Sequence, residues 1–257
     1  MKFLKIAVYL FAAVYLILIV MAFAFQSRFI FHPGKLPYDY RFSLGENDRE
    51  VFLKTPDGET INALFYRGAD TQVVLYFHGN AGDLSNWQEV SHDFVAAGYS
   101  LFIIDYRGYG KSTGFISEQG LYIDAETSWA YLTNTLKFLP EDVIIYGRSI
   151  GTGVAVELAT RHNARGLVLE SPYSSLRKLV QQKVPWLLPS LWLRFYFDNL
   201  KRMALVKSPV MLIHGDSDTL IPLSHTQTLY ETFQGKKMMA IIRQGGHYDL
   251  HAFDEYI

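Results

Sequence analysis

The chain has 257 residues, of which 49% are hydrophobic, and this length fits one α/β domain of ordinary size plus a short additional segment. The formal net charge is −1, with 24 Lys and Arg against 25 Asp and Glu, so the basic face typical of a nucleic-acid binder is missing and we expect no nucleic-acid partner. The chain contains no Cys, which excludes disulfides, cysteine–zinc sites and a thiol nucleophile.

The N-terminal segment is the most apolar part of the chain. Residues 6–25 are twenty consecutive uncharged, apolar or aromatic positions, preceded by Lys2 and Lys5. A helix of this length extends about 30 Å, which matches the hydrocarbon core of a bilayer. We therefore expect residues 1–27 to be an uncleaved transmembrane anchor. A cleaved signal peptide is the alternative, because Ala22-Phe23-Ala24 matches a cleavage site, although the apolar run exceeds the usual core of about 7–15 residues.

The orientation of this anchor depends on the basic residues that flank it. Arg28, Lys35 and Arg41 follow the segment and nearly balance the positive charges before it. The very short N-terminal tail favours a cytoplasmic N-terminus, with the rest of the chain on the non-cytoplasmic side, which is the periplasm if the source is bacterial. Secretion after signal cleavage is the alternative.

Beyond the anchor, residues 28–47 predict an extended connector punctuated by Pro and Gly. Two short alternating runs then flank Pro56-Asp57-Gly58 and predict an antiparallel hairpin. Strands and helices alternate after it, which predicts a mostly parallel central sheet flanked by helices in one α/β domain over residues 48–257. The expected strands are 50–54, 60–66, 72–77, 100–105, 142–146, 166–170, 210–213 and 238–242, and the expected helices are 84–97, 118–137, 150–162, 224–233 and a short one from about 249.

The alternation breaks at about residues 172–208, where we expect a short helical cap insertion. Large apolar side chains crowd the stretch from Trp186 to Phe197, among basic ones. One interpretation is an apolar cover that forms an acyl pocket or dips into lipid. The other is a helix that packs into the core, and the sequence favours neither.

A candidate nucleophile lies between an expected strand and an expected helix, in Gly147-Arg148-Ser149-Ile150-Gly151. A serine on such a sharp turn has its hydroxyl raised above the sheet, and the flanking glycines allow the strained backbone. The pentapeptide alone is a weak signal, because Gly and Ser are common in turns. Its weight depends on the partners that the rest of the chain supplies.

A serine nucleophile needs a base to take its proton and an acid to orient that base. His247 follows the last expected strand, in Gly245-Gly246-His247. The preceding strand leads into His214-Gly215-Asp216-Ser217-Asp218, which supplies an acid. All of these groups follow strand C-termini, where open α/β sheets place their ligands. The sequence therefore predicts that they converge with Ser149 on one edge of the sheet.

The glycine-rich turn Phe77-His78-Gly79-Asn80-Ala81-Gly82-Asp83 follows the first expected parallel strand. Such a turn directs a backbone N–H toward a developing oxyanion. We assign one donor to the backbone N–H of Asn80 and the other to Ile150, the residue after Ser149. His78 is better explained as a residue that orients this loop than as the base.

Over about residues 48–257 the sequence resembles the α/β-hydrolase family of serine hydrolases. The motifs that carry the resemblance are Phe77-His78-Gly79-Asn80-Ala81-Gly82-Asp83, Asp105-Tyr106-Arg107-Gly108-Tyr109-Gly110-Lys111-Ser112, Gly147-Arg148-Ser149-Ile150-Gly151, His214-Gly215-Asp216-Ser217-Asp218-Thr219-Leu220-Ile221-Pro222 and Gly245-Gly246-His247. Within the family it is most similar to a membrane-anchored branch that includes eukaryotic protein depalmitoylases and bacterial relatives, often labelled serine aminopeptidase-like. The resemblance implies the α/β-hydrolase fold, a catalytic Ser149-Asp218-His247 triad, and Asp218 rather than Asp216 as the acid.

Other charged residues have simpler explanations. Asp105 and Arg107 lie among glycines and are expected to hold the shape of a tight polar loop, and Arg148 is left outside the site.

The sequence has no H-E-x-x-H, no Asp-rich loop, no His cluster at metal-ligand spacing and no G-x-G-x-x-G after a strand. We therefore expect neither a metal nor another cofactor.

These observations predict a membrane-anchored serine hydrolase. It is expected to cleave carboxylic esters or thioesters of apolar acyl groups through an acyl-enzyme intermediate, with the lipid bilayer as partner of the N-terminal helix. Two alternatives remain: a serine peptidase or amidase of the same fold, and a catalytically silent, membrane-tethered binding module.

Overall fold

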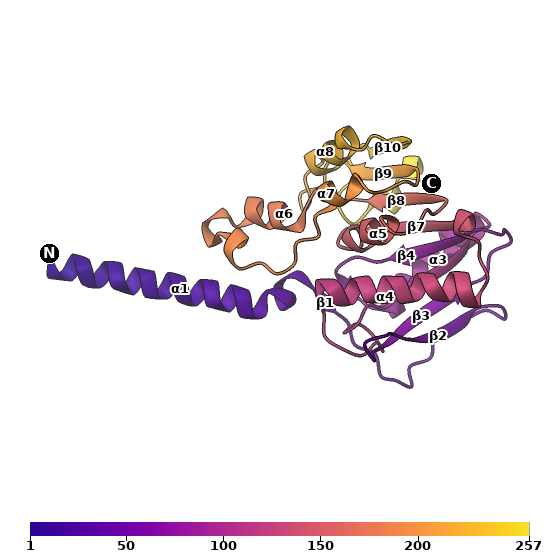
Figure 1. Cartoon of the computed structure of the whole chain (residues 1–257), viewed down its shortest axis with the longest axis horizontal. Helices are drawn as coiled ribbons and strands as arrows, with labels where there is room; N and C mark the ends of the chain where they lie inside the picture. Colours follow the sequence, from indigo (N-terminus) through magenta and orange to yellow (C-terminus); the bar gives the residue numbers. More distant parts are fainter. Residues whose placement is uncertain (257) are drawn as a thin grey trace.

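The computed structural model describes residues 1–256 and has one large sheet at its centre (Figure 1). The eight strands follow the order β10-β9-β8-β7-β4-β6-β3-β2, in which β2 and β3 form an antiparallel hairpin, β3 pairs antiparallel with β6, and all other pairs are parallel. The bounds are β2 (Arg49–Lys54), β3 (Thr60–Tyr66), β4 (Val73–Phe77), β6 (Ser100–Ile104), β7 (Val143–Arg148), β8 (Gly166–Glu170), β9 (Val210–Gly215) and β10 (Lys237–Ile242). The predicted fold class is confirmed.

The central strands are buried on both faces, as their continuous apolar sequences predict. In β4, Val73, Leu75 and Phe77 pack into one hydrophobic cluster, whereas Val74 and Tyr76 pack into the cluster on the opposite face. This alternation follows from the two-residue period of a strand. Both faces of the sheet are therefore covered.

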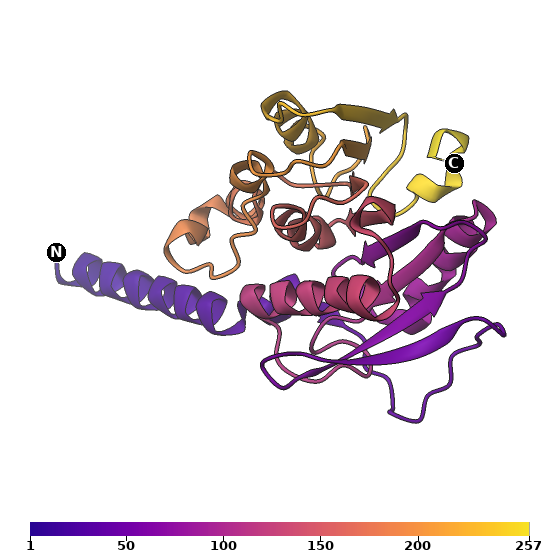
Figure 2. The same ribbon diagram turned by 45° about the vertical axis from the view of Figure 1, so that its right-hand side comes forward.

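The first of these clusters lies under α4 (Glu118–Ala130), α5 (Gly151–Ala159) and α8 (Ser224–Thr232), and the second under α2 (Leu84–Trp87) and α3 (Ser91–Ala96). The two ribbon views show this layering of helix, sheet and helix (Figures 1 and 2). The expected strands all form, with ends that differ by at most two residues.

Four helix predictions were wrong in their extent, and of these the helix expected at 150–162 is α5, which ends three residues early, at Ala159. The single helix expected at 84–97 is α2 and α3 joined by the 3-10 turn η1 (Gln88–Val90), where a β-branched Val and a Ser are weak helix formers. The helix expected at 118–137 leaves α-geometry at the π-turn η2 (Tyr131–Thr135). The expected final helix is two 3-10 turns, η6 (Leu250–Ala252) and η7 (Asp254–Tyr256). A further 3-10 turn, η3 (Pro140–Asp142), precedes β7.

The helix α1 (Lys2–Ile30) projects away from the rest of the molecule, and it continues past residue 27, where we expected the anchor to end (Figure 1). Most of its apolar side chains are exposed, and only Ala22 and Gln26 are buried. By length and composition α1 can cross a membrane, and a signal sequence meets the same criteria. It is a candidate membrane span.

The segment after α1 does more than connect. Its short strand β1 (His32–Pro33) pairs in parallel with β5 (Ala81–Gly82), in the glycine-rich loop after β4. The amide of Leu36 and the carbonyl of Gly34 also bond to Gly110. The end of α1 is therefore fastened to the edge of the sheet where the candidate catalytic residues lie.

The cap insertion contains α6 (Leu176–Lys183), the 3-10 turns η4 (Pro185–Leu187) and η5 (Pro189–Leu191), and α7 (Asn199–Met203). In both ribbon views α6 and the loop after it lie beside α1 rather than over the sheet (Figures 1 and 2). The apolar residues of the insertion differ in burial: Phe197 is fully buried in the core, as the second interpretation predicts, whereas Leu191 is 73% exposed. An acyl pocket or a lipid contact stays a prediction.

Candidate active site

Ser149 lies on the turn between β7 and α5 with a left-handed backbone, φ 52°. Non-glycine residues avoid this region, so the turn is strained, as a nucleophile elbow requires. Its backbone N–H donates to the carbonyl of Glu170 at 2.8 Å. The position of Gly151 has no room for a side chain, because a Cβ there would overlap the carbonyl oxygen of Phe77. Tight packing of α5 against β4 therefore fixes the turn.

His247 follows β10 and reaches Ser149 across the sheet edge. Its Nε2 lies 2.9 Å from Ser149 Oγ, within hydrogen-bond distance. Both side chains are largely buried, with Ser149 at 8% and His247 at 7% exposure. The loop that carries His247 packs on the end of β9, where Gly215 is in direct contact with the backbone of Gly245. A larger residue at 215 would push the two loops apart.

Asp218 completes the arrangement. Its Oδ2 lies 2.6 Å from His247 Nδ1, and its Oδ1 accepts hydrogen bonds from the backbone N–H groups of Leu220 and Ile221, each at 2.8 Å. Burial alone would raise the pKa of Asp218, but its contacts with His214, His247 and the Ile221 amide outweigh burial and hold the pKa well below its usual range. An ionised Asp218 favours the His247 tautomer with the proton on Nδ1, which leaves Nε2 free to accept from Ser149.

Asp216 lies outside this arrangement. Its side chain is exposed and accepts hydrogen bonds from the backbone N–H of Gln244 at 2.7 Å and the hydroxyl of Ser217 at 3.0 Å. It therefore ties the loop after β9 to the loop after β10 and makes no hydrogen bond to His247.

Of the two predicted oxyanion donors, Ile150 directly follows Ser149, and the loop of Asn80 comes close to it, because a Cβ at Gly79 would lie 4.0 Å from Ser149 Cβ. Within residues 1–256, neither the Asn80 nor the Ile150 backbone N–H donates to a protein acceptor. Asn80 itself is held from several sides: its carbonyl accepts from the His32 amide and the Tyr109 hydroxyl, each at 2.8 Å, and its side-chain amide donates to the carbonyl of Ile30 at 3.0 Å. The sequence did not predict these contacts with the end of α1 and with β1.

His78 is fully buried beneath this loop. Its Nδ1 lies 2.7 Å from the carbonyl of Gly79, its Nε2 lies 3.6 Å from Asp105 Oδ1, and its ring packs on Tyr106 at 4.4 Å. Burial raises the pKa of Asp105 even though His78 opposes this. These contacts orient the loop that carries Asn80.

Arg107 forms ion pairs with Asp57 at 2.7 Å and with Asp124 at 2.8 Å. It thereby joins the β2–β3 hairpin turn to α4. This is the structural role that the glycine-rich sequence around it predicts.

Arg148 takes part in a cluster that the sequence left open. It forms an ion pair at 3.0 Å with one carboxylate oxygen of the fully buried Glu170. The other carboxylate oxygen of Glu170 accepts hydrogen bonds from the hydroxyls of Tyr146 and Tyr256, at 2.7 and 3.0 Å. A guanidinium nitrogen of Arg148 also lies 3.4 Å from the carbonyl of Tyr248, next to His247. The cluster therefore links the serine turn to the loop that carries His247.

His214 is a second residue that sequence reasoning left without a role. It is fully buried, its Nε2 donates to the carbonyl of Ile221 at 2.8 Å, and the same nitrogen lies 3.4 Å from Asp218 Oδ2. The sequence signal that could have identified His214 is its position at the end of β9, four residues before Asp218. It supports the turn that presents the carboxylate.

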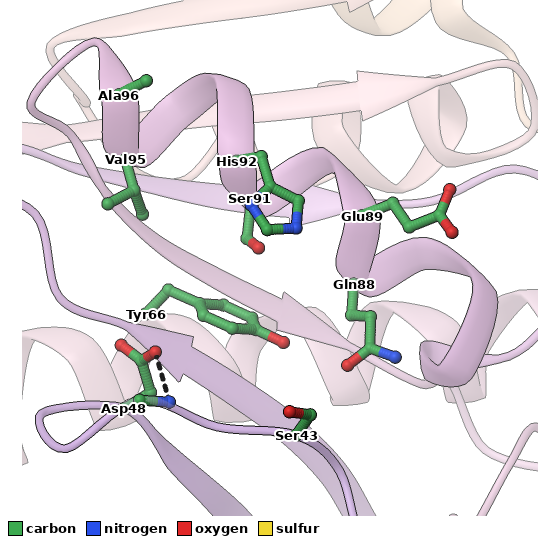
Figure 3. Close-up of a pocket in the computed structure, with 10 residues that line it drawn as sticks. Ser43, Asp48, Tyr66, Gln88, Glu89, Ser91, His92, Val95 and Ala96 are labelled. Carbon is green, nitrogen blue, oxygen red and sulfur yellow. Dashed lines mark hydrogen bonds between the residues drawn. The ribbon is translucent and has the colours of Figure 1, made fainter.

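A cavity of about 600 Å³ lies elsewhere, between the β2–β3 side and α3 (Figure 3). Figure 3 shows Tyr66, Ser91 and His92 facing it, with Asp48 bonded to the backbone of Gly45 at 3.0 Å. Neither Ser149, nor His247, nor Asp218 lines this cavity. Within residues 1–256 no group of three or more His, Cys, Asp or Glu residues is arranged to hold a metal ion.

Comparison with known proteins decides the family. A family model described as "Serine aminopeptidase, S33" matches residues 68–203. The alpha/beta hydrolase domain-containing protein 17B of Homo sapiens is 33% identical over 242 residues, which cover 90% of this chain and 80% of the human protein. The chain belongs to this α/β-hydrolase family. An uncharacterized protein of Mycobacterium tuberculosis is 32% identical over 232 residues, covering 89% of this chain and 83% of the relative.

Solved structures agree on the fold of this hydrolase. The Pyrococcus furiosus esterase Pf2001 superposes with a TM-score of 0.70 at 18% identity and covers 85% of this chain and 90% of its own. An acetyl xylan esterase from Paenibacillus sp. R4 gives a TM-score of 0.65 at 18% identity, with 82% of each chain covered. The protein is thus an α/β-hydrolase with an esterase-like architecture.

Proposed function

We propose that this protein is a membrane-anchored serine hydrolase that cleaves carboxylic ester or thioester bonds of apolar acyl groups. The observation that carries the proposal is the position of His247, which lies 2.9 Å from Ser149 Oγ and 2.6 Å from Asp218 Oδ2. A nucleophile, a base and an orienting carboxylate in one hydrogen-bonded line are the parts that acyl transfer needs.

In the acylation step Ser149 Oγ attacks the acyl carbonyl carbon while His247 Nε2 takes the hydroxyl proton. The carbonyl oxygen becomes an oxyanion, which accepts hydrogen bonds from the Asn80 and Ile150 amides. The tetrahedral intermediate then collapses, and the bond from the acyl carbon to the leaving oxygen or sulfur breaks. The imidazolium of His247 gives its proton to the leaving oxygen or sulfur. Ser149 now carries the acyl group as an ester.

In the deacylation step a water molecule replaces the alcohol or thiol. His247 takes a proton from the water, the hydroxide attacks the acyl-enzyme carbon, and the same two amides donate hydrogen bonds to the oxyanion. When this intermediate collapses, Ser149 recovers its proton from His247 and the carboxylic acid departs. No step requires a metal or another cofactor.

The preference for an apolar acyl group rests on the surroundings of the site. The edge of the sheet that carries Asn80 is hydrogen-bonded to the end of α1. A bilayer around α1 would therefore place the site close to the membrane surface, where esters of long acyl chains are concentrated. A peptidase or amidase would use the same three residues. Only a hydrolysis assay with ester, thioester and amide substrates can therefore distinguish these leaving groups.

Retention of α1 is part of the proposal. The residue Ala22, within the candidate cleavage site Ala22-Phe23-Ala24, is 7% exposed and packs against Trp192, and Gln26 is 1% exposed. Cleavage after Ala24 would remove this contact and uncover the cap. We propose an intact N-terminus in the cytoplasm and a hydrolase domain on the other side, which is the periplasm in a bacterium. Mass spectrometry of the membrane-extracted protein tests retention: loss of residues 1–24 would contradict it.

A hydrolysis panel tests the activity. The full chain in detergent is assayed with p-nitrophenyl esters of short and long acyl chains, an acyl thioester and an aminoacyl amide, beside the Ser149→Ala variant. We expect ester and thioester hydrolysis that Ser149→Ala abolishes. Hydrolysis of the amide alone would favour the peptidase, and a folded protein that turns over none of these substrates would favour the silent binding module.

A further inference from the structure

We propose that residues 184–193, which we call the cap segment, are inserted into the hydrocarbon region of the bilayer beside α1. This inference rests on the proposed membrane anchoring by α1 and extends it to a second membrane-contacting surface. The sequence of the cap segment is Val-Pro-Trp-Leu-Leu-Pro-Ser-Leu-Trp-Leu, in which Ser190 is the one polar side chain, between Lys183 and Arg194.

The cap segment runs along the C-terminal half of α1. The hydroxyl of Tyr15 donates to the carbonyl of Trp186 at 2.7 Å, and the side chain of Gln26 accepts from the amide of Arg194 at 2.6 Å. Between these two points Ala22 packs against Trp192. Gln26 is the eleventh residue after Tyr15 in the helix, which corresponds to a rise along the helix axis of about 16 Å. This distance is about half the thickness of a hydrocarbon core.

The position of Tyr15 sets the depth. It lies at the middle of the apolar run of residues 6–25. If α1 crosses the bilayer, Tyr15 and the carbonyl of Trp186 lie near its midplane. Two polar groups at that depth cost free energy unless they bind each other, and here they do. In a segment that faces water, the carbonyl of Trp186 would have no need of a partner on α1.

Several other polar groups of the cap segment also bind within the protein. The indole N–H of Trp192 donates to the carbonyl of Leu187 at 2.6 Å, and the side-chain amide of Gln26 donates to the carbonyl of Trp192 at 3.3 Å. The amides of Leu188 and Leu191 bond within the two 3-10 turns. These groups are therefore satisfied inside the protein, as a lipid environment demands.

Apart from Ser190, the side chains that the cap segment presents outward are apolar. Trp186 is 58%, Leu188 43% and Leu191 73% exposed, next to the exposed apolar side of α1. The basic residues stand at the base of the cap segment: Arg194 lies over the ring of Phe23 at 4.8 Å, and Lys183 donates to the carbonyl of Thr219. Apolar side chains inside and cations at the interface match the layering of a bilayer.

The chain has no Cys, so single-cysteine spin labels can test the insertion without background. Leu191→Cys reports on the cap segment and Ile17→Cys, at a position 60% exposed, reports on α1. The matched control is Leu139→Cys, at a 55% exposed leucine directly before η3, in the hydrolase domain. Each labelled full chain is reconstituted into phosphatidylcholine and phosphatidylglycerol vesicles, and its accessibility to oxygen and to a water-soluble nickel chelate is measured by electron paramagnetic resonance.

We expect the labels at 191 and 17 to be more accessible to oxygen than to the nickel chelate, and the label at 139 to show the reverse. An aqueous label at 191 beside a lipid-exposed label at 17 would overturn the insertion and leave the anchor standing. Aqueous labels at both positions would overturn both claims. The proposed hydrolase activity is measured separately, by hydrolysis of a soluble short-chain ester. If the protein does not hydrolyse this ester, the proposed function fails, but the lipid exposure of residue 191 still stands as an independent result.

Discussion

The side-chain amide of Asn80 donates to the carbonyl oxygen of Ile30, the last residue of α1, at 3.0 Å. One candidate oxyanion donor is thus tied to the end of the candidate membrane helix, fifty residues earlier in the chain. The amide of His32 bonds the carbonyl of Asn80 at 2.8 Å and reinforces the link. The position of α1 and the geometry of the candidate site are therefore coupled.

This coupling predicts that Asn80→Ala lowers kcat by about tenfold with little change in KM. The backbone N–H survives, so the loss should stay below the factor of about 10²–10³ that follows removal of an oxyanion donor. Steady-state hydrolysis of a short-chain ester measures it. Asn86→Ala, at an exposed position in α2, is the matched control, and equal kcat values for both variants would contradict the role of Asn80.

The left-handed backbone of Ser149 leads to a prediction about stability. Glycine adopts φ 52° without strain, whereas alanine does not. We expect Ser149→Gly to unfold with a free energy about 1 kcal/mol higher than Ser149→Ala, with both variants inactive. Urea unfolding of the full chain in detergent compares them. If Ser149→Ala were the more stable of the two, the serine turn would not be strained in solution.

Asp218→Asn tests the role assigned to the carboxylate. The Leu220 and Ile221 amides donate to Oδ1, so the asparagine carbonyl would occupy that position and turn its NH2 group toward His247 Nδ1. The imidazole would then carry its proton on Nε2 and lose the ability to accept from Ser149. We expect kcat to fall by about 10⁴ while the fold is retained.

Asp216→Asn is the control for this substitution, because Asp216 is exposed and makes no hydrogen bond to His247. It should keep nearly full activity. A larger loss of kcat for Asp216→Asn than for Asp218→Asn would show that Asp216, and not Asp218, is the acid that orients His247.

His225 gives the fold a predictable pH dependence. Burial, and then the charges of Lys178, His214 and Lys183, lower the pKa of His225 from 6.5 to about 4. Between these two values the unfolded chain binds a proton that the folded chain does not, so this group makes the protein less stable as the pH falls from 6.5 to 4 and has no effect above that window. Its neutral Nδ1 accepts from the Ser174 amide at 3.2 Å.

The measurement is the melting temperature at pH 7 and at pH 4.5. We expect His225→Gln to lose less stability on acidification than the natural chain. His251→Gln, at an exposed position, should behave like the natural chain. Equal acid sensitivity in all three proteins would show that His225 does not titrate as described.

The sequence predicted those parts of the site that depend on local structure. A strand, a Gly-x-Ser-x-Gly turn and a helix follow each other directly, so the position of Ser149 could be inferred without tertiary information. His247 and Asp218 follow neighbouring parallel strands, and parallel strands bring their C-terminal ends to one edge. The same logic located the loop of Asn80.

The parts that the sequence could not predict depend on contacts between distant segments. The pairing of β1 with β5 joins residues about fifty positions apart, and a two-residue strand leaves no alternating pattern to recognise. Glu170 and Arg148 become partners because β7 and β8 lie side by side in register. Burial of these charges, and the contact between α1 and the cap segment, follow from packing rather than from local composition.

The most direct test of the account is the reaction of the folded full chain with a fluorophosphonate, followed by intact-mass spectrometry and peptide mapping. We predict one covalent adduct, located on Ser149, that is absent in Ser149→Ala and forms much more slowly in Asp218→Asn. A folded natural chain that takes no adduct, or one that is labelled on another serine while Ser149→Ala reacts unchanged, would contradict the claim that this hydrolase acts through Ser149.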